Sequence, residues 1–160
     1  MAKKTKVKKT LVEQILTKSG VSHKGIQINA LEGQLPEGIK RSHIFKTLAL
    51  LGDKSGPIIG ILPITEHLSE KKLAKVSGNK KVSMIPQKDL EKTTGYIHGA
   101  NNPVGIRQKH NYPIFIDETA LELERLIVSA GEVGHSIIIS PKDLANFVKA
   151  SFVDILEEIN

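Results

Sequence analysis

Lys46 stands in the most apolar run of the first half of the chain, Ile44 to Leu51. An ammonium group in such a run is costly to bury unless it meets a partner or opens into a cleft. In a strand, every second side chain can face water, so Lys46 could simply lie on a solvated face. If it faces a pocket instead, its charge could hold a phosphate or stabilise a developing oxyanion. The sequence leaves both interpretations open.

The glycine-rich segment Gly95–Ile106 is the second candidate. It reads GYIHGANNPVGI, with three glycines, two asparagines and one proline set among apolar residues. Glycine lets the main chain approach a ligand closely, and Pro103 restricts the chain before anything binds. We therefore expect a shaped loop, held at both ends, that presents its backbone to a ligand. His98 is interpreted as an ordinary residue of this loop.

The third candidate is the turn Ser129-Ala130-Gly131. Small residues and a hydroxyl at a strand end can supply backbone N–H donors and one adjustable O–H group. A hairpin turn without a function would look much the same.

Several other chemistries find no support in the sequence. Cysteine is absent, which excludes disulfides, thiolate nucleophiles and cysteine-ligated metals. The six histidines include no pair four residues apart and no HExxH, so we expect no metal site. There is no GxxxxGK[ST] phosphate loop and no GxSxG elbow. We expect no bound cofactor.

Periodicity and turn residues divide the chain into short, mixed elements. Helices are expected at 10–19, 69–77, 86–94 and 141–149. Strands are expected at 24–31, 41–51, 57–64, 81–85, 114–116, 126–129 and 136–139. A turn or short helix is expected at 118–124, and a helix or a strand and turn at 152–159. The Gly52–Gly56 turn between two apolar runs predicts a β-hairpin. Without regular alternation of strands and helices, this order predicts a single α+β domain around a mixed, mostly antiparallel sheet.

Basic residues exceed acidic ones, 23 to 17, for a net charge of +6, and five lysines fall in the first nine residues. We interpret residues 1–9 as a flexible basic arm, either a solvated terminus or a contact for a polyanion. Few aromatic residues (4%) argue against a general RNA-binding module. No apolar run approaches the roughly 18 residues of a membrane span, and the absence of cysteine fits the cytoplasm.

Three segments together resemble the YbaK/EbsC family. They are Phe45-Lys46-Thr47-Leu48, the loop from Gly95 to Gly105, and Val128-Ser129-Ala130-Gly131, in this order and approximate spacing. The family resembles the editing domain inserted in bacterial prolyl-tRNA synthetases, and its members hydrolyse mischarged aminoacyl-tRNA in trans. The resemblance covers nearly the whole chain and implies that residues 10–160 form a barrel-like mixed sheet with helices packed around it.

The resemblance also implies roles for individual residues. Lys46 matches the functionally required lysine of the family and is the expected catalytic residue. The expected substrate-binding residues are Thr47, Gly99, Ala100, Pro103, Ser129 and Gly131, of which Gly99 and Pro103 match the family's GxxxP loop. One difference stands out: many members carry an aspartate a few residues after the Ser-x-Gly turn, where this chain has Ser136.

The activity implied by the resemblance is trans-editing deacylation of mischarged Cys-tRNA(Pro), or of Cys-tRNA(Cys), by a cytoplasmic monomer or weak dimer. Prolyl-tRNA synthetase is a further candidate partner, and no membrane contact is expected. Ester cleavage by the substrate's own thiol and attack by a bound water both stay open. Two other functions also stay open: a catalytically silent regulatory or binding module of the same fold, and an editing hydrolase for another amino acid, such as alanine on tRNA(Pro).

Overall fold

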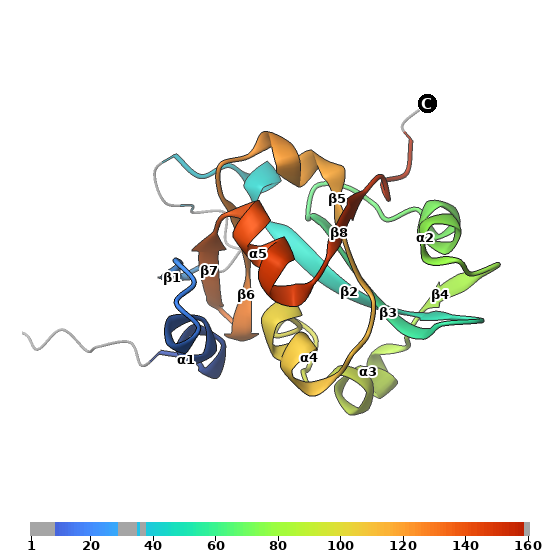
Figure 1. The fold of residues 1–160 in the computed structure, drawn as a ribbon, viewed down its shortest axis with the longest axis horizontal. Helices are drawn as coiled ribbons and strands as arrows, with labels where there is room; N and C mark the ends of the chain where they lie inside the picture. The colour runs from blue at the N-terminus through green and yellow to red at the C-terminus, as the bar shows by residue number, and fades with distance from the viewer. Residues whose placement is uncertain (1–8, 29–34, 36–37, 159–160) are drawn as a thin grey trace, which may run out of the picture.

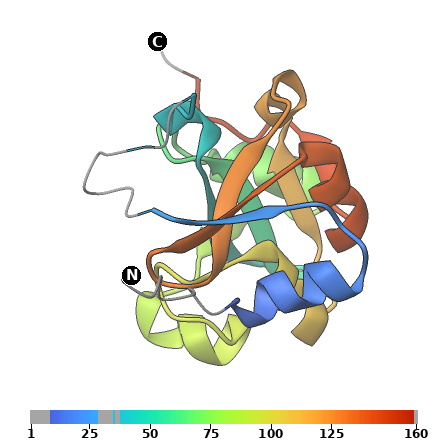
Figure 2. The same ribbon diagram turned by 90° about the vertical axis from the view of Figure 1, so that its left-hand side faces the viewer.

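Two sheets form the framework of the molecule in the computed structural model, which describes residues 9–28, 35 and 38–158 (Figure 1). In the three-stranded sheet, β7 (His135–Ile139) lies between β1 (Lys24–Gln27) and β6 (Leu126–Glu132), and all neighbours are antiparallel. Figure 2 brings this sheet to the front, with β1 nearest the viewer and α1 (Leu11–Lys18) below it.

The five-stranded sheet has the order β4-β2-β3-β5-β8. Its strands are β2 (Phe45–Gly52), β3 (Gly56–Pro63), β4 (Val82–Met84), β5 (Ile114–Asp117) and β8 (Ser151–Val153). β2 pairs antiparallel with β3 and β4, whereas β5 runs parallel to both β3 and β8. The prediction of an α+β fold with mixed, mostly antiparallel strands is confirmed.

The predicted barrel-like closure is wrong. The two sheets meet at a parallel bridge between Ile44 and Ile127, just before β2 and within β6. β3 pairs with β2 along its whole length, but on the other edge β4 reaches only Leu50–Gly52. Because no described strand pairs with that edge between Ile44 and Leu50, the sheets stay separate there. The β2–β3 hairpin was predictable from its local turn, but this edge depends on segments far apart in the sequence.

Helices form where the sequence supplies caps. Thr10 and Glu13 make a reciprocal capping box at the start of α1. Serines cap the N-termini of α2 (Glu70–Ser77) and α5 (Pro141–Val148), and α2 ends at left-handed Gly78. The helix α3 (Gln87–Thr94) begins after Pro86, and short 3-10 helices are η2 (Arg41–His43) and η3 (Glu118–Glu122). The four predicted helices are confirmed, with ends shifted by one or two residues.

The loop in the glycine-rich segment ends earlier than predicted. A helix, α4 (Pro103–Lys109), begins inside it, because the Asn102 side chain accepts a hydrogen bond from the Gly105 amide and Pro103 fits the first helical position. Only residues 95–102, called the glycine loop from here on, connect α3 to α4. The segment predicted to be a loop at 103–106 is therefore helical.

Three apolar groups fill the molecule. The main core is shared by both sheets and includes Phe45, Ala49, Val104, Val128 and Ile137. A second group on the other face of the five-stranded sheet packs under α2. A third lies where the sheets meet and contains Ile28, Ile44, Ile127 and Ile138. These groups show which face of each strand a side chain occupies.

Several remaining predictions can be placed. The β2–β3 hairpin is confirmed, and the β6 and β7 strands extend further into the predicted turn, with an irregular register between Ser129 and Glu132. The predicted strand 24–31 ends at Gln27, and its residues 29–31 lie outside the described chain. Residues 1–8 of the predicted basic arm also lie outside it. Within the described ranges, no helix is long and apolar enough to cross a membrane.

Candidate active site

Lys46 faces away from the main core. Its neighbour Phe45 belongs to the main core, whereas Ile44 belongs to the apolar group at the sheet junction. Because side chains alternate along a strand, Lys46 shares the junction face with Ile44. The ammonium Nζ is half-buried and donates a hydrogen bond to the backbone carbonyl of Glu66, at 2.8 Å. Lys46 is therefore held in a partly enclosed position on this face.

The environment of Lys46 alters its basicity. Desolvation by burial lowers the pKa of the Lys46 ammonium from its ordinary value, and the negative charge of Glu66 partly opposes that shift. Lys46 makes no ion pair within 4.0 Å with any carboxylate of the described chain. Its positive charge is consequently available to an anionic or polarised group of a ligand.

Two serine hydroxyls occupy the same junction face. Ser129 and Ser136 are direct cross-strand partners on β6 and β7, and Ser136 also pairs with Ile26 of β1. Ser129 shares its strand face with Ile127, which bridges to Ile44 beside Lys46. The Ser129 hydroxyl accepts a hydrogen bond from the Gly131 amide at 3.2 Å. At Ser136, where the resemblance led us to expect an aspartate nearby, this face presents a neutral hydroxyl.

The glycine loop packs against the β6–β7 hairpin. A Cβ atom placed on Gly99 would meet Val133 at 3.4 Å, and one on Gly131 would meet Asn102 at 3.3 Å and Tyr96 at 3.4 Å. Both glycines have positive φ, +89° and +92°, so a side chain at either position would also strain the backbone. Gly99 is exposed, so its backbone is open to a ligand.

Other predicted residues contribute by shaping the loop. Ala100 and Pro103 are both buried, and Pro103 starts α4. The Thr47 side chain lies on the opposite face of β2 from Lys46, and its hydroxyl is buried without a hydrogen-bond partner. The structure thus brings Lys46 and Ser129 to one face, and Gly99 and Gly131 to one loop–hairpin contact. It does not bring the Thr47 side chain to that face, and the predicted roles of these residues stay predictions.

Asn101 is a residue that sequence reasoning missed. Its side-chain Nδ2 donates to the backbone carbonyl of Thr47 at 3.1 Å, which ties the glycine loop to β2. Its Oδ1 is buried and has no partner. Capping α4 requires only Asn102, so the second asparagine before Pro103 was the available signal for an additional role.

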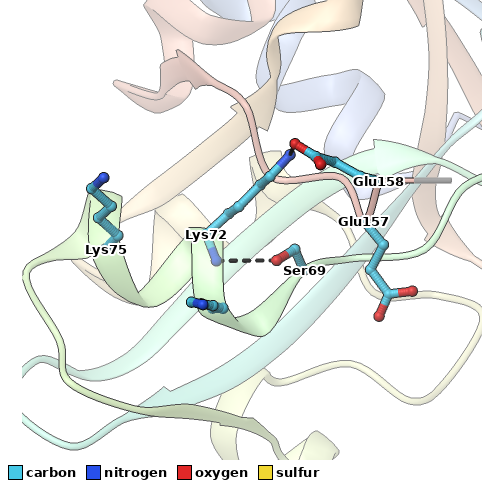
Figure 3. Close-up of a pocket in the computed structure, with 6 residues that line it drawn as sticks. Ser69, Lys72, Lys75, Glu157 and Glu158 are labelled. Atoms are coloured by element: carbon cyan, nitrogen blue, oxygen red, sulfur yellow. Dashed lines mark hydrogen bonds and ion pairs between the residues drawn. The ribbon is translucent and has the colours of Figure 1, made fainter. Parts of the chain in front are cut away.

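A hollow lies at the α2 end of the molecule, away from the junction face. Figure 3 shows it between α2 and the C-terminal segment, and Ser69, Lys71, Lys72, Lys75, Glu157 and Glu158 line it. Lys72 is engaged there by Asp154 at 2.9 Å and by Glu158 at 3.7 Å. In Figure 1, α2 lies at the opposite end of the long axis from β1 and β7. None of the predicted site residues lines this hollow, and its charges largely neutralise one another.

The described chain contains no group of three or more His, Cys, Asp or Glu residues that could hold a metal ion. Lys46, Ser129 and Ser136 bring one ammonium and two hydroxyls to the junction face. Such a set can position a carbonyl and stabilise negative charge on oxygen.

The family model of the aminoacyl-tRNA editing domain matches residues 31–147, more than half of the chain. The chain belongs to the aminoacyl-tRNA editing domain family. The matched region of this editing domain includes Lys46, the glycine loop and the β6–β7 hairpin. The resemblance inferred from the three sequence segments is thereby confirmed.

A curated relative extends the match to nearly the whole editing domain. A protein of Enterococcus faecalis (strain ATCC 700802 / V583) is 37% identical over 162 residues, covering 97% of this chain and 98% of the relative. It carries the provisional name Cys-tRNA(Pro)/Cys-tRNA(Cys) deacylase EbsC.

Solved structures share the fold of the editing domain at lower identity. One is provisionally described as a trans-editing enzyme for prolyl tRNA synthetase and has a TM-score of 0.78 at 22% identity, covering 92% of this chain and 95% of that one. Another, a hypothetical protein, has a TM-score of 0.81 at 21% identity, covering 91% and 99%.

Proposed function

We propose that this editing domain is a trans-editing deacylase that cleaves the aminoacyl ester of Cys-tRNA(Pro), with Cys-tRNA(Cys) as a second substrate. The relative from Enterococcus faecalis carries this proposal, because its name gives both substrates and the two chains match over nearly their full lengths. The junction face supports it, since Lys46 and two serine hydroxyls meet there beside a loop with accessible backbone.

The chemistry suits a site of this composition. An ester needs little acid–base assistance, because a ribose oxygen leaves more readily than an amine. The ammonium of Lys46 would stabilise negative charge on the reacting oxygens, and backbone groups of the glycine loop would hold the aminoacyl end. Ser129 and Ser136 would hydrogen-bond the substrate's amine or carbonyl.

The substrate thiol is the nucleophile that this proposal favours. The cysteine sulfur attacks its own carbonyl carbon, a sulfur–carbon bond forms, and the carbon–oxygen ester bond breaks. The thiol proton passes to the departing ribose oxygen, and the cysteine leaves as a cyclic thioester. This route requires no general base from the protein. That fits the junction face, where no carboxylate of the described chain forms an ion pair with Lys46.

A deacylation panel tests the proposal. The substrates are Cys-, Ala- and Ser-tRNA(Pro), with Pro-tRNA(Pro) as the cognate control. We expect release of cysteine alone, because serine and alanine lack the thiol. Release of alanine or serine at a similar rate would contradict the thiol route and favour attack by water. Hydrolysis of the proline ester would contradict an editing role.

Ser136 supports the second candidate function, a binding module without catalysis, because the resemblance to the family led us to expect an aspartate near this position. The same panel separates the two: a binding module would retain tRNA yet release no amino acid from any ester.

The basic N-terminus supplies the proposed contact with the tRNA backbone. Five of the first nine residues are lysines, and each phosphate contact adds salt-dependent, sequence-independent affinity. Deleting residues 1–9 should weaken tRNA binding several-fold at low salt and flatten its salt dependence, with little change in kcat. An unchanged binding curve would reject the arm. Prolyl-tRNA synthetase as a partner and a monomer or weak dimer also remain proposals.

A further inference from the structure

One edge of β2 is completed by a side chain instead of a strand. The carbonyls of Ala49 and Thr47 both point to the edge that β4 leaves uncovered beyond Leu50. The amide of Ile85 reaches the Ala49 carbonyl at 3.2 Å. At the next position along this edge, the donor is Nδ2 of Asn101, 3.1 Å from the Thr47 carbonyl. Asn101 thus takes the place of a neighbouring strand's backbone.

The hydrogen bond fixes which way the Asn101 carboxamide is turned. Only its NH2 group can donate to a carbonyl, so Oδ1 must point away from the Thr47 oxygen. Oδ1 then has no partner, although Asn101 is only 7% exposed. A buried acceptor without a partner costs free energy, so Asn101 is a poor choice for stability alone. What the bond does contribute is position, because it holds the glycine loop against β2.

The bond joins two parts of the candidate site. On one side it reaches Thr47, the residue directly after Lys46. On the other side, the loop that carries Asn101 contacts the hairpin that carries Ser129, through Gly99 at Val133 and Asn102 at Gly131. Asn101 therefore links the strand that carries the ammonium to the wall formed by the loop and the hairpin.

We propose that Asn101 is a positioning residue of the deacylation reaction. Its bond from Nδ2 to the Thr47 carbonyl sets the separation between the glycine loop and the strand that carries Lys46. This inference rests on the proposed function. Displacing reacting groups by about 1 Å can slow a reaction about 100-fold, so a single tether beside Lys46 has a large effect on rate.

Asn101→Ala and Asn101→Leu remove the tether, and Asn101→Asp keeps the shape but replaces the donor with an acceptor. With Cys-tRNA(Pro), we expect each variant to lower kcat/KM by about 10- to 100-fold. For Asn101→Ala and Asn101→Leu the pH profile should keep its shape, because neither substitution adds or removes a titratable group near Lys46. Asn146→Ala is the control for an asparagine substitution outside the candidate site, because Asn146 is exposed on α5. Its kcat/KM for Cys-tRNA(Pro) should match that of the wild type.

Asn79→Ala is the matched control for burial. Asn79 is 8% exposed and bonds the far end of the β2–β3 hairpin, so this variant should lose stability while keeping kcat/KM. If Asn101→Ala and Asn79→Ala lower activity to the same extent, the effect is general destabilisation and the proposal is overturned. A kcat/KM within about twofold of wild type for Asn101→Ala overturns it as well.

Amide hydrogen exchange gives a readout that needs no activity. Asn101→Ala should speed exchange at least about tenfold in residues 95–102 and leave α2 at the wild-type rate. Unchanged protection of the loop overturns the tether. If the wild-type protein releases no cysteine, the proposed function fails by itself, and the exchange data still decide whether Asn101 holds the loop.

Discussion

Two buried asparagines anchor the β2–β3 hairpin, Asn79 at its turn and Asn101 at strand β2, and they differ in how fully they are bonded. Asn79 accepts from the Lys54 and Ser55 amides and donates to the hydroxyls of Ser55 and Ser77. Asn101 makes a single bond to β2, and its Oδ1 is left without a partner.

The difference separates two purposes of a buried amide. A fully bonded carboxamide such as Asn79 stabilises a turn, because none of its buried polar atoms is left without a hydrogen bond. Asn101 and Thr47 leave two buried polar atoms unpaired at the position beside Lys46. Among the buried side-chain N and O atoms of the described residues these two are the exceptions, and such exceptions are typical of functional regions.

The largest expected effect on activity comes from removing the charge of Lys46, the residue next to the Thr47 carbonyl that Asn101 bonds. Lys46→Ala should lower kcat for Cys-tRNA(Pro) by at least about 100-fold, the scale of losing one electrostatic stabiliser of a developing oxyanion. Circular dichroism should be unchanged, because Lys46 is only half-buried and outside the main core. Lys75→Ala, a lysine of α2 at the far end, is the control. A fully active Lys46→Ala protein would remove Lys46 from the mechanism.

The pH dependence sharpens the same assignment. Burial lowers the pKa of Lys46, so its charge is lost at a lower pH than for a free lysine. If the charged form is required, kcat should fall as the pH rises through this lowered pKa. The free energy of unfolding should change in the opposite sense. Between the lowered pKa of folded Lys46 and its pKa in the unfolded chain, the unfolded chain binds more protons, so the free energy of unfolding rises with pH. Lys46→Met should abolish both trends. If the free energy of unfolding of Lys46→Met rises at alkaline pH just as in the wild type, another group causes that rise.

Asn79→Ala tests the stabilising anchor. It removes four hydrogen bonds and leaves the Lys54 and Ser55 amides without their acceptor, so we expect a loss of about 2–3 kcal/mol in unfolding free energy. Urea denaturation measures the change. Well below the unfolding temperature, kcat/KM should match wild type. A large loss of activity in the folded variant would mean that the two anchors are not functionally distinct.

Thr47→Val has the smallest expected effect, and it should raise stability where Asn79→Ala lowers it. Its hydroxyl is buried without a partner, and valine has nearly the same shape, so unfolding free energy should rise by up to about 1 kcal/mol. If substrate uses this hydroxyl, as the predicted binding role requires, kcat/KM should fall at the same time. A stabilised variant with unchanged kinetics would assign Thr47 a role through its backbone carbonyl alone.

Local features of the chain were predictable because each depends on a few neighbouring residues. Apolar periodicity and turn residues located the helices within about one residue of their ends, and the Gly52–Gly56 turn located a hairpin. Lys46 and Ser129 could be named as candidates from their motifs. Their common face could not be derived, because it depends on the register that joins Ile44 to Ile127, residues far apart in the sequence.

The errors have related causes. Three glycines and Pro103 suggested a loop as far as residue 106, but Asn102 and Pro103 together form a helix start that the glycine content obscured. The barrel expectation failed because the open edge of β2 is closed by Ile85 and by the Asn101 side chain, which no strand periodicity reveals. For Thr47 the motif gave no orientation: strand alternation turns its side chain to the other face of β2 from Lys46, and its predicted binding role stays a prediction.

The way the glycine loop is attached has an evolutionary consequence. On its β2 side the loop is held by an Asn101 side chain instead of a ladder of backbone bonds, and on the hairpin side by contacts of Val133, Asn102 and Tyr96. Point substitutions can therefore reshape the loop without breaking a sheet. We therefore expect residues 95–102 to be exchangeable as one segment while both sheets keep their strand pairing.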